Sequence, residues 1–181
     1  WDEQVRVTGN TVVDATLEAG RRIVGWELER LHGPLVAGFI RANLHRRLLV
    51  VSAHRRENWG GGIAGIAQGI RELLIDQEGI AILWTLHANR LVHDEVLSGL
   101  GDLPSVVRGR VCLAPPMDYP SMIGAMGRAW MVLTDSGGLQ EEAATLGVPV
   151  IMPPAVRPRP SGRLPANKPK VGLLLATICT E

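Results

Sequence analysis

Residues 133–150, which read LTDSGGLQEEAATLGVPV, limit the possible folds of this chain more than any other segment. The apolar residues 130–134 predict the end of a buried strand, and residues 135–138 predict a turn. A helix is expected over residues 139–145, and a second strand is expected to begin at Val148. This order is a βαβ unit, whose two strands run parallel because the helix carries the chain back to the same end of the sheet.

Apolar runs and amphipathic segments alternate over most of the chain. Strands are expected at residues 5–7, 47–53, 80–86 and 110–114, and helices at residues 11–22, 63–76, 89–98 and 119–127. Residues 23–46 contain several Gly and one Pro that interrupt any long period, so helical pieces and loop are expected there. The series predicts an α/β fold with a Rossmann-like, doubly wound parallel sheet, in which ligands bind at the carboxyl ends of the strands.

The chain is expected to divide near residue 152. Residues 1–152 carry the alternating pattern and are expected to form the domain. Residues 153–181 begin with a stretch rich in Pro and basic residues, which predicts a loop or disordered arm, and end in an apolar run that could form a strand. The two cysteines, Cys112 and Cys179, stand alone in apolar surroundings and are expected to be reduced, as in a cytoplasmic protein.

Charge and residue spacing exclude several classes of partner. Nineteen basic and eighteen acidic residues give a net charge of +1, so nucleic acid is not an expected partner. No apolar run is long enough to span a bilayer, so no membrane partner is expected. The five histidines, at positions 32, 45, 54, 87 and 93, lack the spacing of metal ligands, and no metal is expected.

The predicted helix after residue 138 has the features of an anion site. Gly137 and Gly138 allow a bound group to approach the backbone, and the first amides of the helix with its dipole attract negative charge. Ser136 could cap this helix or donate its hydroxyl to a phosphate. Glu141 and Glu142 would repel such an anion unless one of them has another partner, such as a ribose diol. The alternative is a capped turn only, because neither dinucleotide nor P-loop spacing is present.

His54, His87, Pro116 and Ser136 each follow a predicted strand end, so the topology is expected to bring them to one rim of the sheet. His54 could act as an acid or base near neutral pH, and the arginines that follow it could hold a phosphate. The alternative is a solvated charged turn in which Glu57 pairs with an arginine. A triad of Ser136, His54 and Asp135 is disfavoured because Ser136 lacks the Gly-x-Ser-x-Gly elbow.

Four segments together resemble a known family. VTGNTVVDA at residues 7–15, SAHRRENWG at 52–60, PPMDYPSMIGAM at 115–126 and LTDSGGLQEEAATLGVPV at 133–150 are similar to the C-terminal half of non-hydrolysing UDP-N-acetylglucosamine 2-epimerases. The resemblance implies the C-terminal domain of a glycosyltransferase-B-like fold. It also implies interconversion of UDP-N-acetylglucosamine and UDP-N-acetylmannosamine through elimination and re-addition of UDP, with no cofactor, in the service of cell-envelope polysaccharide synthesis.

The resemblance also implies roles for individual residues. His54 would be the catalytic residue of this half, and His87 matches a position that contacts a second, regulatory UDP-sugar in some members. The segment around Tyr119 would lie near the uracil, the Ser-Gly-Gly turn would hold the diphosphate, and one carboxylate would take the ribose hydroxyls. The residues implied to contact the substrate are Arg55, Met122, Ser136, Gly137, Gly138 and Glu142.

The chain departs from the family pattern at both ends. The N-terminal domain that supplies the catalytic carboxylates is missing from the 181 residues, and the glutamates expected around Arg159–Pro160 are missing too. We therefore expect a UDP-sugar-binding half that needs an N-terminal domain or a partner chain, that forms a homodimer, and that is inactive alone. The alternatives are a non-catalytic nucleotide-sugar-binding module, an inactive remnant, or a glycosyltransferase-like half that transfers the sugar to an acceptor.

Overall fold

The computed structural model describes residue 6 and residues 9–153. The expected strand at residues 5–7, the apolar run near the C-terminus and Cys179 therefore cannot be compared with it. Cys112, the other cysteine, is buried, as expected from its apolar surroundings.

A five-stranded sheet forms the centre of the described region. Its strands are β1 (Arg47–Ser52), β2 (Ile80–Thr85), β3 (Val111–Ala114), β4 (Met131–Thr134) and β5 (Val150–Ile151). Every pairing is parallel, and the order across the sheet is β3-β2-β1-β4-β5. In the centre, Val51 of β1 stands opposite Trp84 of β2 and Leu133 of β4. The predicted doubly wound parallel sheet is thus confirmed.

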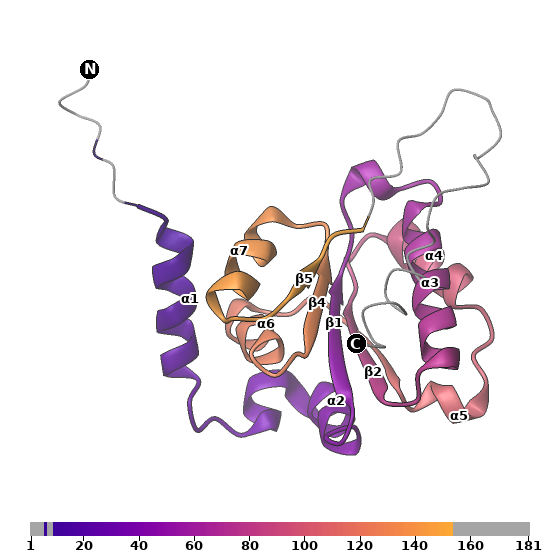
Figure 1. Cartoon of the computed structure of the whole chain (residues 1–181), viewed down its shortest axis with the longest axis horizontal. Helices are drawn as coiled ribbons and strands as arrows, with labels where there is room; N and C mark the ends of the chain where they lie inside the picture. The colour runs from indigo at the N-terminus through magenta and orange to yellow at the C-terminus, as the bar shows by residue number, and fades with distance from the viewer. Residues whose placement is uncertain (1–5, 7–8, 154–181) are drawn as a thin grey trace.

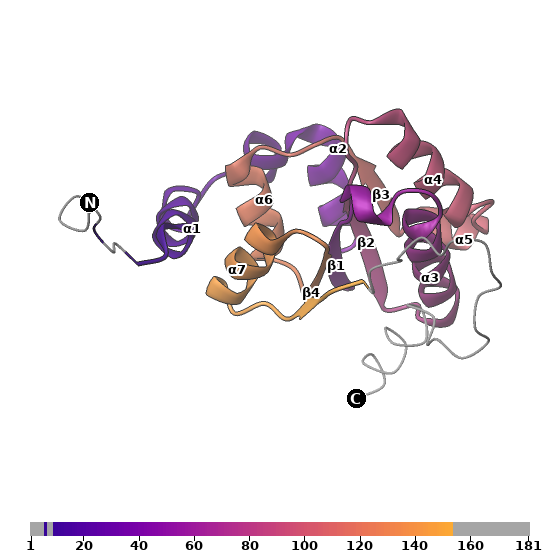
Figure 2. The same cartoon turned by 90° about the horizontal axis from the view of Figure 1, so that it is seen from above.

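Helices cover both faces of this sheet (Figures 1 and 2). On one face lie α3 (Gly62–Asp76), α4 (Arg90–Leu100) and the short α5 (Ser105–Arg108), and on the other lie α2 (Leu28–Ala42), α6 (Tyr119–Met126) and α7 (Gly137–Thr145). Alternate residues of a strand point to opposite faces, so Leu49 and Val51 pack under α3 and α4, whereas Val50 packs under α2 and α6. Both faces of β1 are buried, which explains its continuous apolar sequence.

Helix α1 (Thr11–Arg22) has the bounds that its sequence predicts. Asn10 caps it by accepting a hydrogen bond from the Val12 amide over 3.0 Å. The helix packs on α6 and α7 at the edge of the molecule, beyond the sheet (Figure 1). The α2 region consists of two helical pieces that meet at a kink, as expected, because Gly33 takes a φ of 72° directly before Pro34.

Two boundaries in the βαβ unit differ from expectation. The helix α7 begins at Gly137, two residues earlier than predicted, so the glycine pair forms its first turn. The strand β5 begins at Val150 instead of Val148. The reason is that the Val148 amide donates to the Ala143 carbonyl and completes the end of α7, while Gly147 turns the chain with a φ of 72°.

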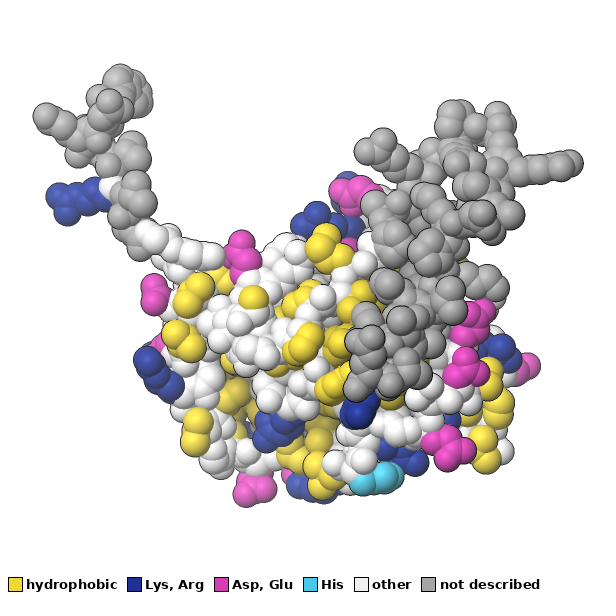
Figure 3. All heavy atoms as spheres, viewed as in Figure 1, with side chains coloured by type: hydrophobic (Ala, Val, Ile, Leu, Met, Phe, Trp, Pro, Cys, Tyr) yellow, Lys and Arg dark blue, Asp and Glu magenta, His cyan; other side chains and the backbone are white. Residues whose placement is uncertain are grey.

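The surface mixes both signs of charge. Figure 3 shows Lys and Arg side chains interspersed with Asp and Glu side chains over the described part of one face, with apolar side chains between them. Among the described residues, no helix combines the length and apolar character needed to cross a bilayer. The same residues contain no cluster of three or more His, Cys, Asp or Glu side chains that could hold a metal ion.

Candidate functional site

The site is built where the winding of the sheet reverses. From β1 the chain adds β2 and β3 on one side and then returns to place β4 and β5 on the other. The loops after β1 and β4 therefore leave a crevice between them at the carboxyl ends of these strands, which is the usual ligand position in an open α/β sheet. The predicted site residues of both loops lie at this crevice.

A hollow of about 490 Å³ opens at this rim. It is lined from the ends of β1, β2 and β4, from the segment after β3, and from α6 and α7. Six of the eight residues predicted to contact a ligand line it, which are His54, His87, Met122, Ser136, Gly138 and Glu142. Residues predicted from four separate segments of sequence thus share one cavity.

The other two predicted residues, Arg55 and Gly137, lie beside the hollow and close to each other. Nη2 of Arg55 is 3.8 Å from the point where a Cβ on Gly137 would stand. The guanidinium therefore lies at the beginning of α7, where it adds a full positive charge to the partial positive charge of the helix end.

The beginning of α7 is open to a ligand. Ser136 is its N-cap residue in an extended conformation, and its amide donates to the Thr134 hydroxyl over 3.0 Å. Among the described residues, the Ser136 side chain makes no capping hydrogen bond, so of its two predicted roles capping is not observed. The hydroxyl is therefore free to bind a group in the hollow, next to the first amides of the helix.

The glycine-rich beginning of α3, by contrast, is already occupied. Glu95 of α4 accepts hydrogen bonds from the amides of Gly60, Gly61 and Ala64 over 2.8, 3.1 and 3.3 Å. A carboxylate of the chain itself thus satisfies the amides that an external anion would need. The amides at the beginning of α7 are therefore a better candidate for an anion site than those at the beginning of α3.

His54 and His87 stack against each other at the rim. Their ring centroids are 5.2 Å apart and the rings are inclined by 19°. Burial lowers the pKa of His54, the charges of His87 and Arg55 act in the same direction, and Asp135 opposes them. His54 is therefore neutral at pH 7 and can accept a proton. Nδ1 of His87 accepts a hydrogen bond from the Asn89 amide over 3.1 Å, which fixes the orientation of that ring.

The two neighbouring carboxylates on α7 have different partners. Glu141 is exposed and accepts a hydrogen bond from Nδ2 of Asn10 over 3.0 Å. Glu142 faces the hollow, where burial and the charge of Glu141 raise its pKa while the Tyr119 hydroxyl lowers it. The Tyr119 hydroxyl also lies 3.1 Å from the hydroxyl of Thr16 on α1. Only one member of the pair is thus directed at a ligand.

Asp135 is the residue whose role the sequence did not reveal. Its carboxylate accepts hydrogen bonds from the backbone amides of His54 and Arg55 and from the side chain of Asn58. These contacts use the backbone of His54, so they do not form the Ser136-His54-Asp135 triad. Spacing alone offered no signal for them, because the partners lie about 80 positions apart in the chain.

The alternative of a simple charged turn at residues 54–58 is not supported. Among the described residues, Glu57 forms no ion pair with either neighbouring arginine. Instead, residues 56–58 form a short 3₁₀ turn held by Asp135, and Nε1 of Trp59 donates to the His54 carbonyl over 2.9 Å. The turn is thus a fixed part of the rim.

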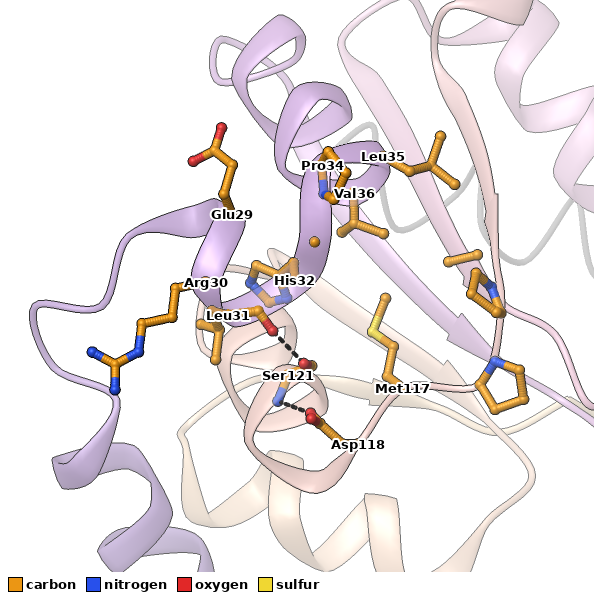
Figure 4. Close-up of a pocket in the computed structure, with 14 residues that line it drawn as sticks. Glu29, Arg30, Leu31, His32, Pro34, Leu35, Val36, Met117, Asp118 and Ser121 are labelled. Carbon is orange, nitrogen blue, oxygen red and sulfur yellow. Dashed lines mark hydrogen bonds between the residues drawn. The ribbon is translucent and has the colours of Figure 1, made fainter.

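A second hollow, of about 500 Å³, lies between α2 and the segment after β3 (Figure 4). Ser121 donates from its hydroxyl to the Leu31 carbonyl and from its amide to Asp118 there. Both ring nitrogens of His32 are buried without a partner among the described residues, and burial, with a smaller effect of Arg128, lowers the pKa of this ring to about 4. The predicted rim position Pro116 lines both hollows, and none of the residues predicted to contact a ligand lines this one, so it is not the candidate site.

Comparison with known proteins gives consistent matches. The family model described as UDP-N-acetylglucosamine 2-epimerase matches residues 1–178. A UDP-N-acetylglucosamine 2-epimerase of Salmonella typhimurium is 35% identical over 159 residues, which cover 88% of this chain and 40% of that protein. The enzyme of the same name from Escherichia coli K12 is 32% identical over 151 residues, or 83% of this chain and 38% of that protein.

A solved structure agrees with these matches. The UDP-GlcNAc 2-epimerase of Neisseria meningitidis, which was crystallised with UDP-GlcNAc bound, superposes with a TM-score of 0.66 at 29% sequence identity. The alignment covers 83% of this chain and 40% of that one. The chain thus spans about 40% of the length of the curated relatives it matches.

Proposed function

Because the chain belongs to the UDP-N-acetylglucosamine 2-epimerase family, we propose that it binds the UDP group of a UDP-N-acetylhexosamine as the nucleotide half of such an enzyme. The observation that carries this proposal is the open beginning of α7, which shares one hollow with Glu142 and His54. In this proposal residues 1–152 form the UDP-binding domain, and residues 153–181 follow it as a separate tail.

The diphosphate binds at the beginning of α7. Gly137 and Gly138 permit close approach to the first amides of the helix, and the Ser136 hydroxyl donates a further hydrogen bond. The Arg55 guanidinium beside Gly137 neutralises part of the charge. Fixed donors of this kind stabilise the diphosphate most when it carries the extra charge of a leaving group.

The nucleoside binds along α6 and α7. Glu142 accepts hydrogen bonds from the ribose hydroxyls, which is the role that separates it from its exposed neighbour Glu141. Met122 and Tyr119 line the same hollow and offer apolar contact to the uracil ring. In this proposal the diphosphate, the ribose and the base thus contact the glycine turn, Glu142 and Tyr119, respectively.

His54 contributes to the chemistry at the sugar. Inversion of C2 through loss of UDP from C1 requires that a proton leave C2 and the C1–O bond break, and that a proton then add to the opposite face of C2 while UDP re-forms the C1–O bond. His54 is neutral at pH 7 and faces the hollow, so it can accept a proton or hydrogen-bond the departing phosphate. In this proposal further acids and bases come from an N-terminal domain or a partner chain, and no cofactor or metal takes part.

Three further roles are proposed from the resemblance. His87 contacts a second, regulatory UDP-sugar, and its exposed ring next to His54 is compatible with that role. The protein works as a homodimer. It acts in the cytoplasm and supplies an amino sugar for cell-envelope polysaccharides.

Calorimetric titration with UDP, with UMP as the comparison, tests the proposal. We expect UDP to bind with a micromolar dissociation constant and UMP to bind more weakly, because the β-phosphate makes the contacts at α7. Equal affinity for both nucleotides would contradict the diphosphate assignment. Absence of binding would contradict the function as a whole.

The chain matches only part of each relative's length, and this partial match favours a second candidate function. A chain that spans about 40% of the matched enzymes could bind a nucleotide sugar without converting it. Adding an N-terminal half from a relative distinguishes the two candidates. Restored epimerisation indicates the enzyme half, continued binding without conversion indicates a binding module, and transfer of the sugar to an acceptor would indicate a glycosyltransferase-like protein.

A further inference from the structure

Asp135 connects the two loops of the rim. Its Oδ2 accepts hydrogen bonds from the His54 amide over 3.0 Å, from the Arg55 amide over 2.8 Å and from Nδ2 of Asn58 over 2.8 Å. Its Oδ1 lies 3.2 Å from the same His54 amide. These four residues, Asp135, His54, Arg55 and Asn58, are called the Asp135 cluster below.

The Asp135 cluster fixes the backbone on both sides of His54. The amide of His54 is held by Asp135, and its carbonyl is held by the Trp59 indole. Asn58 is only 4% exposed, so its hydrogen bond with Asp135 is shielded from competition by water. The imidazole and the guanidinium that follow in the chain therefore start from a fixed backbone.

The position of Asp135 is unfavourable for simple electrostatics. It directly precedes Ser136 at the beginning of α7, where the proposed diphosphate binds. A carboxylate next to the proposed diphosphate site repels the diphosphate, so a neutral residue would give tighter binding if charge were the only effect. The Asp135 cluster offers a reason for the carboxylate, because an ionised acceptor can take several hydrogen bonds at once.

We propose that Asp135 is a positioning residue of the UDP site. Its carboxylate holds the backbone of His54 and Arg55 so that the imidazole faces the hollow and the guanidinium reaches the beginning of α7. The proposal rests on the proposed function, since UDP binding is the property that the positioning serves. It differs from a charge effect in sign: loss of positioning weakens UDP binding, and loss of a nearby negative charge strengthens it.

The test compares UDP binding by the whole chain and three variants. In Asp135→Asn a neutral amide oxygen, which is a weaker acceptor than a carboxylate, replaces the acceptor on which the His54, Arg55 and Asn58 hydrogen bonds converge, and we expect the dissociation constant to rise on the order of tenfold. In the double variant Asp135→Asn, Asn58→Asp a negative charge returns to the cluster, but the His54 and Arg55 amides still lack a carboxylate acceptor, so we expect the affinity to stay reduced. Glu57→Gln removes a carboxylate from the same loop outside the cluster, and we expect a change within about twofold.

A second readout follows the His54 ring by NMR titration. Asp135 raises the pKa of His54 against burial, His87 and Arg55, which all lower it. Asp135→Asn is therefore expected to lower the pKa of His54 further, and the double variant, which keeps one negative charge in the cluster, is expected to restore it. A pKa of His54 that recovers while the affinity for UDP stays reduced separates the loss of positioning from the loss of charge.

The outcomes separate the two proposals. If the parent chain does not bind UDP, the proposed function fails. If the parent binds UDP and folded Asp135→Asn binds it equally well or more tightly, the positioning role is overturned. If no variant folds, hydrogen exchange of the parent decides: protected His54 and Arg55 amides whose protection increases with UDP support the role, and unprotected amides overturn it.

Discussion

At the scale of single residues, Glu142 is expected to bind the ribose hydroxyls of UDP. Glu142→Ala should weaken UDP binding by about 1 to 3 kcal/mol, because it leaves buried hydroxyls without an acceptor. Calorimetry with UDP and 2′-deoxy-UDP measures the effect, and the parent should prefer UDP while the variant loses that preference. Glu141→Ala is the matched control, since Glu141 bonds to Asn10 at the surface. An unchanged preference in Glu142→Ala would remove it from the ribose role.

His32 is expected to make the fold sensitive to acid. Its pKa is lowered to about 4 by burial, and secondarily by Arg128, against an ordinary value of 6.5. Above pH 6.5 the ring is neutral in both folded and unfolded chains. As the pH falls from 6.5 toward 4, the unfolded chain takes up a proton that the folded chain does not, so stability decreases.

The expected loss is about 1 to 2 kcal/mol, which is the linkage value reduced for the part of the ring that water reaches. Urea unfolding of the parent and of His32→Leu at pH 7 and pH 4.5 measures it. The variant should lose less stability than the parent between these pH values. His45→Leu, which changes an exposed histidine, should behave like the parent, and equal losses in all three proteins would contradict the assignment.

At the scale of elements, Glu95 is expected to stabilise the beginning of α3. It accepts hydrogen bonds from Gly60, Gly61 and Ala64, so Glu95→Gln should reduce the free energy of unfolding by about 1 kcal/mol. Thermal unfolding with Glu72→Gln as control measures this, because in the described part of the chain Glu72 bonds only to Gln68 on the surface of the same helix. A variant as stable as the parent would show that the amides are equally well satisfied by water.

Local patterns predicted most elements and few of the contacts between them. Helix α1 has its predicted bounds because its N-cap residue, Asn10, directly precedes the helix in the sequence. The rim residues His54, His87 and Ser136 were grouped correctly because topology alone brings parallel strand ends together. The late start of β5 was not foreseen, since it depends on where the Val148 amide finds an acceptor.

The hydrogen-bond partners of Asp135 show more clearly which contacts cannot be predicted from the sequence. Nothing near Asp135 in the sequence distinguishes a carboxylate that caps a distant loop from one that orients a histidine ring. The same holds for Glu141 and Glu142, which are adjacent in sequence and whose separate roles depend on Asn10 and Tyr119. Residue types and spacing thus predicted which residues share the hollow, and only the structure showed their hydrogen-bond partners.

At the scale of the whole molecule, we expect the isolated chain to have no epimerase activity. It spans about 40% of the matched relatives, and the described rim supplies His54 as its only predicted catalytic residue. Incubation with UDP-N-acetylglucosamine and NMR detection of the mannosamine epimer measures this. UDP should still raise the melting temperature of the chain by mass action. Epimer formed by the pure chain would contradict the expectation.

The contacts of Asp135 also set the order in which this site can arise during synthesis. The His54 amide and its acceptor are separated by 81 residues, and β1 and β4 pair over a similar separation. A ribosome takes on the order of 10 s to add 80 residues. During that interval the loop after β1 exists but Asp135 has not yet been added. The hydrogen bonds of the Asp135 cluster can therefore form only after α3, α4, α5 and α6, which lie between β1 and β4 in the chain, have been synthesised.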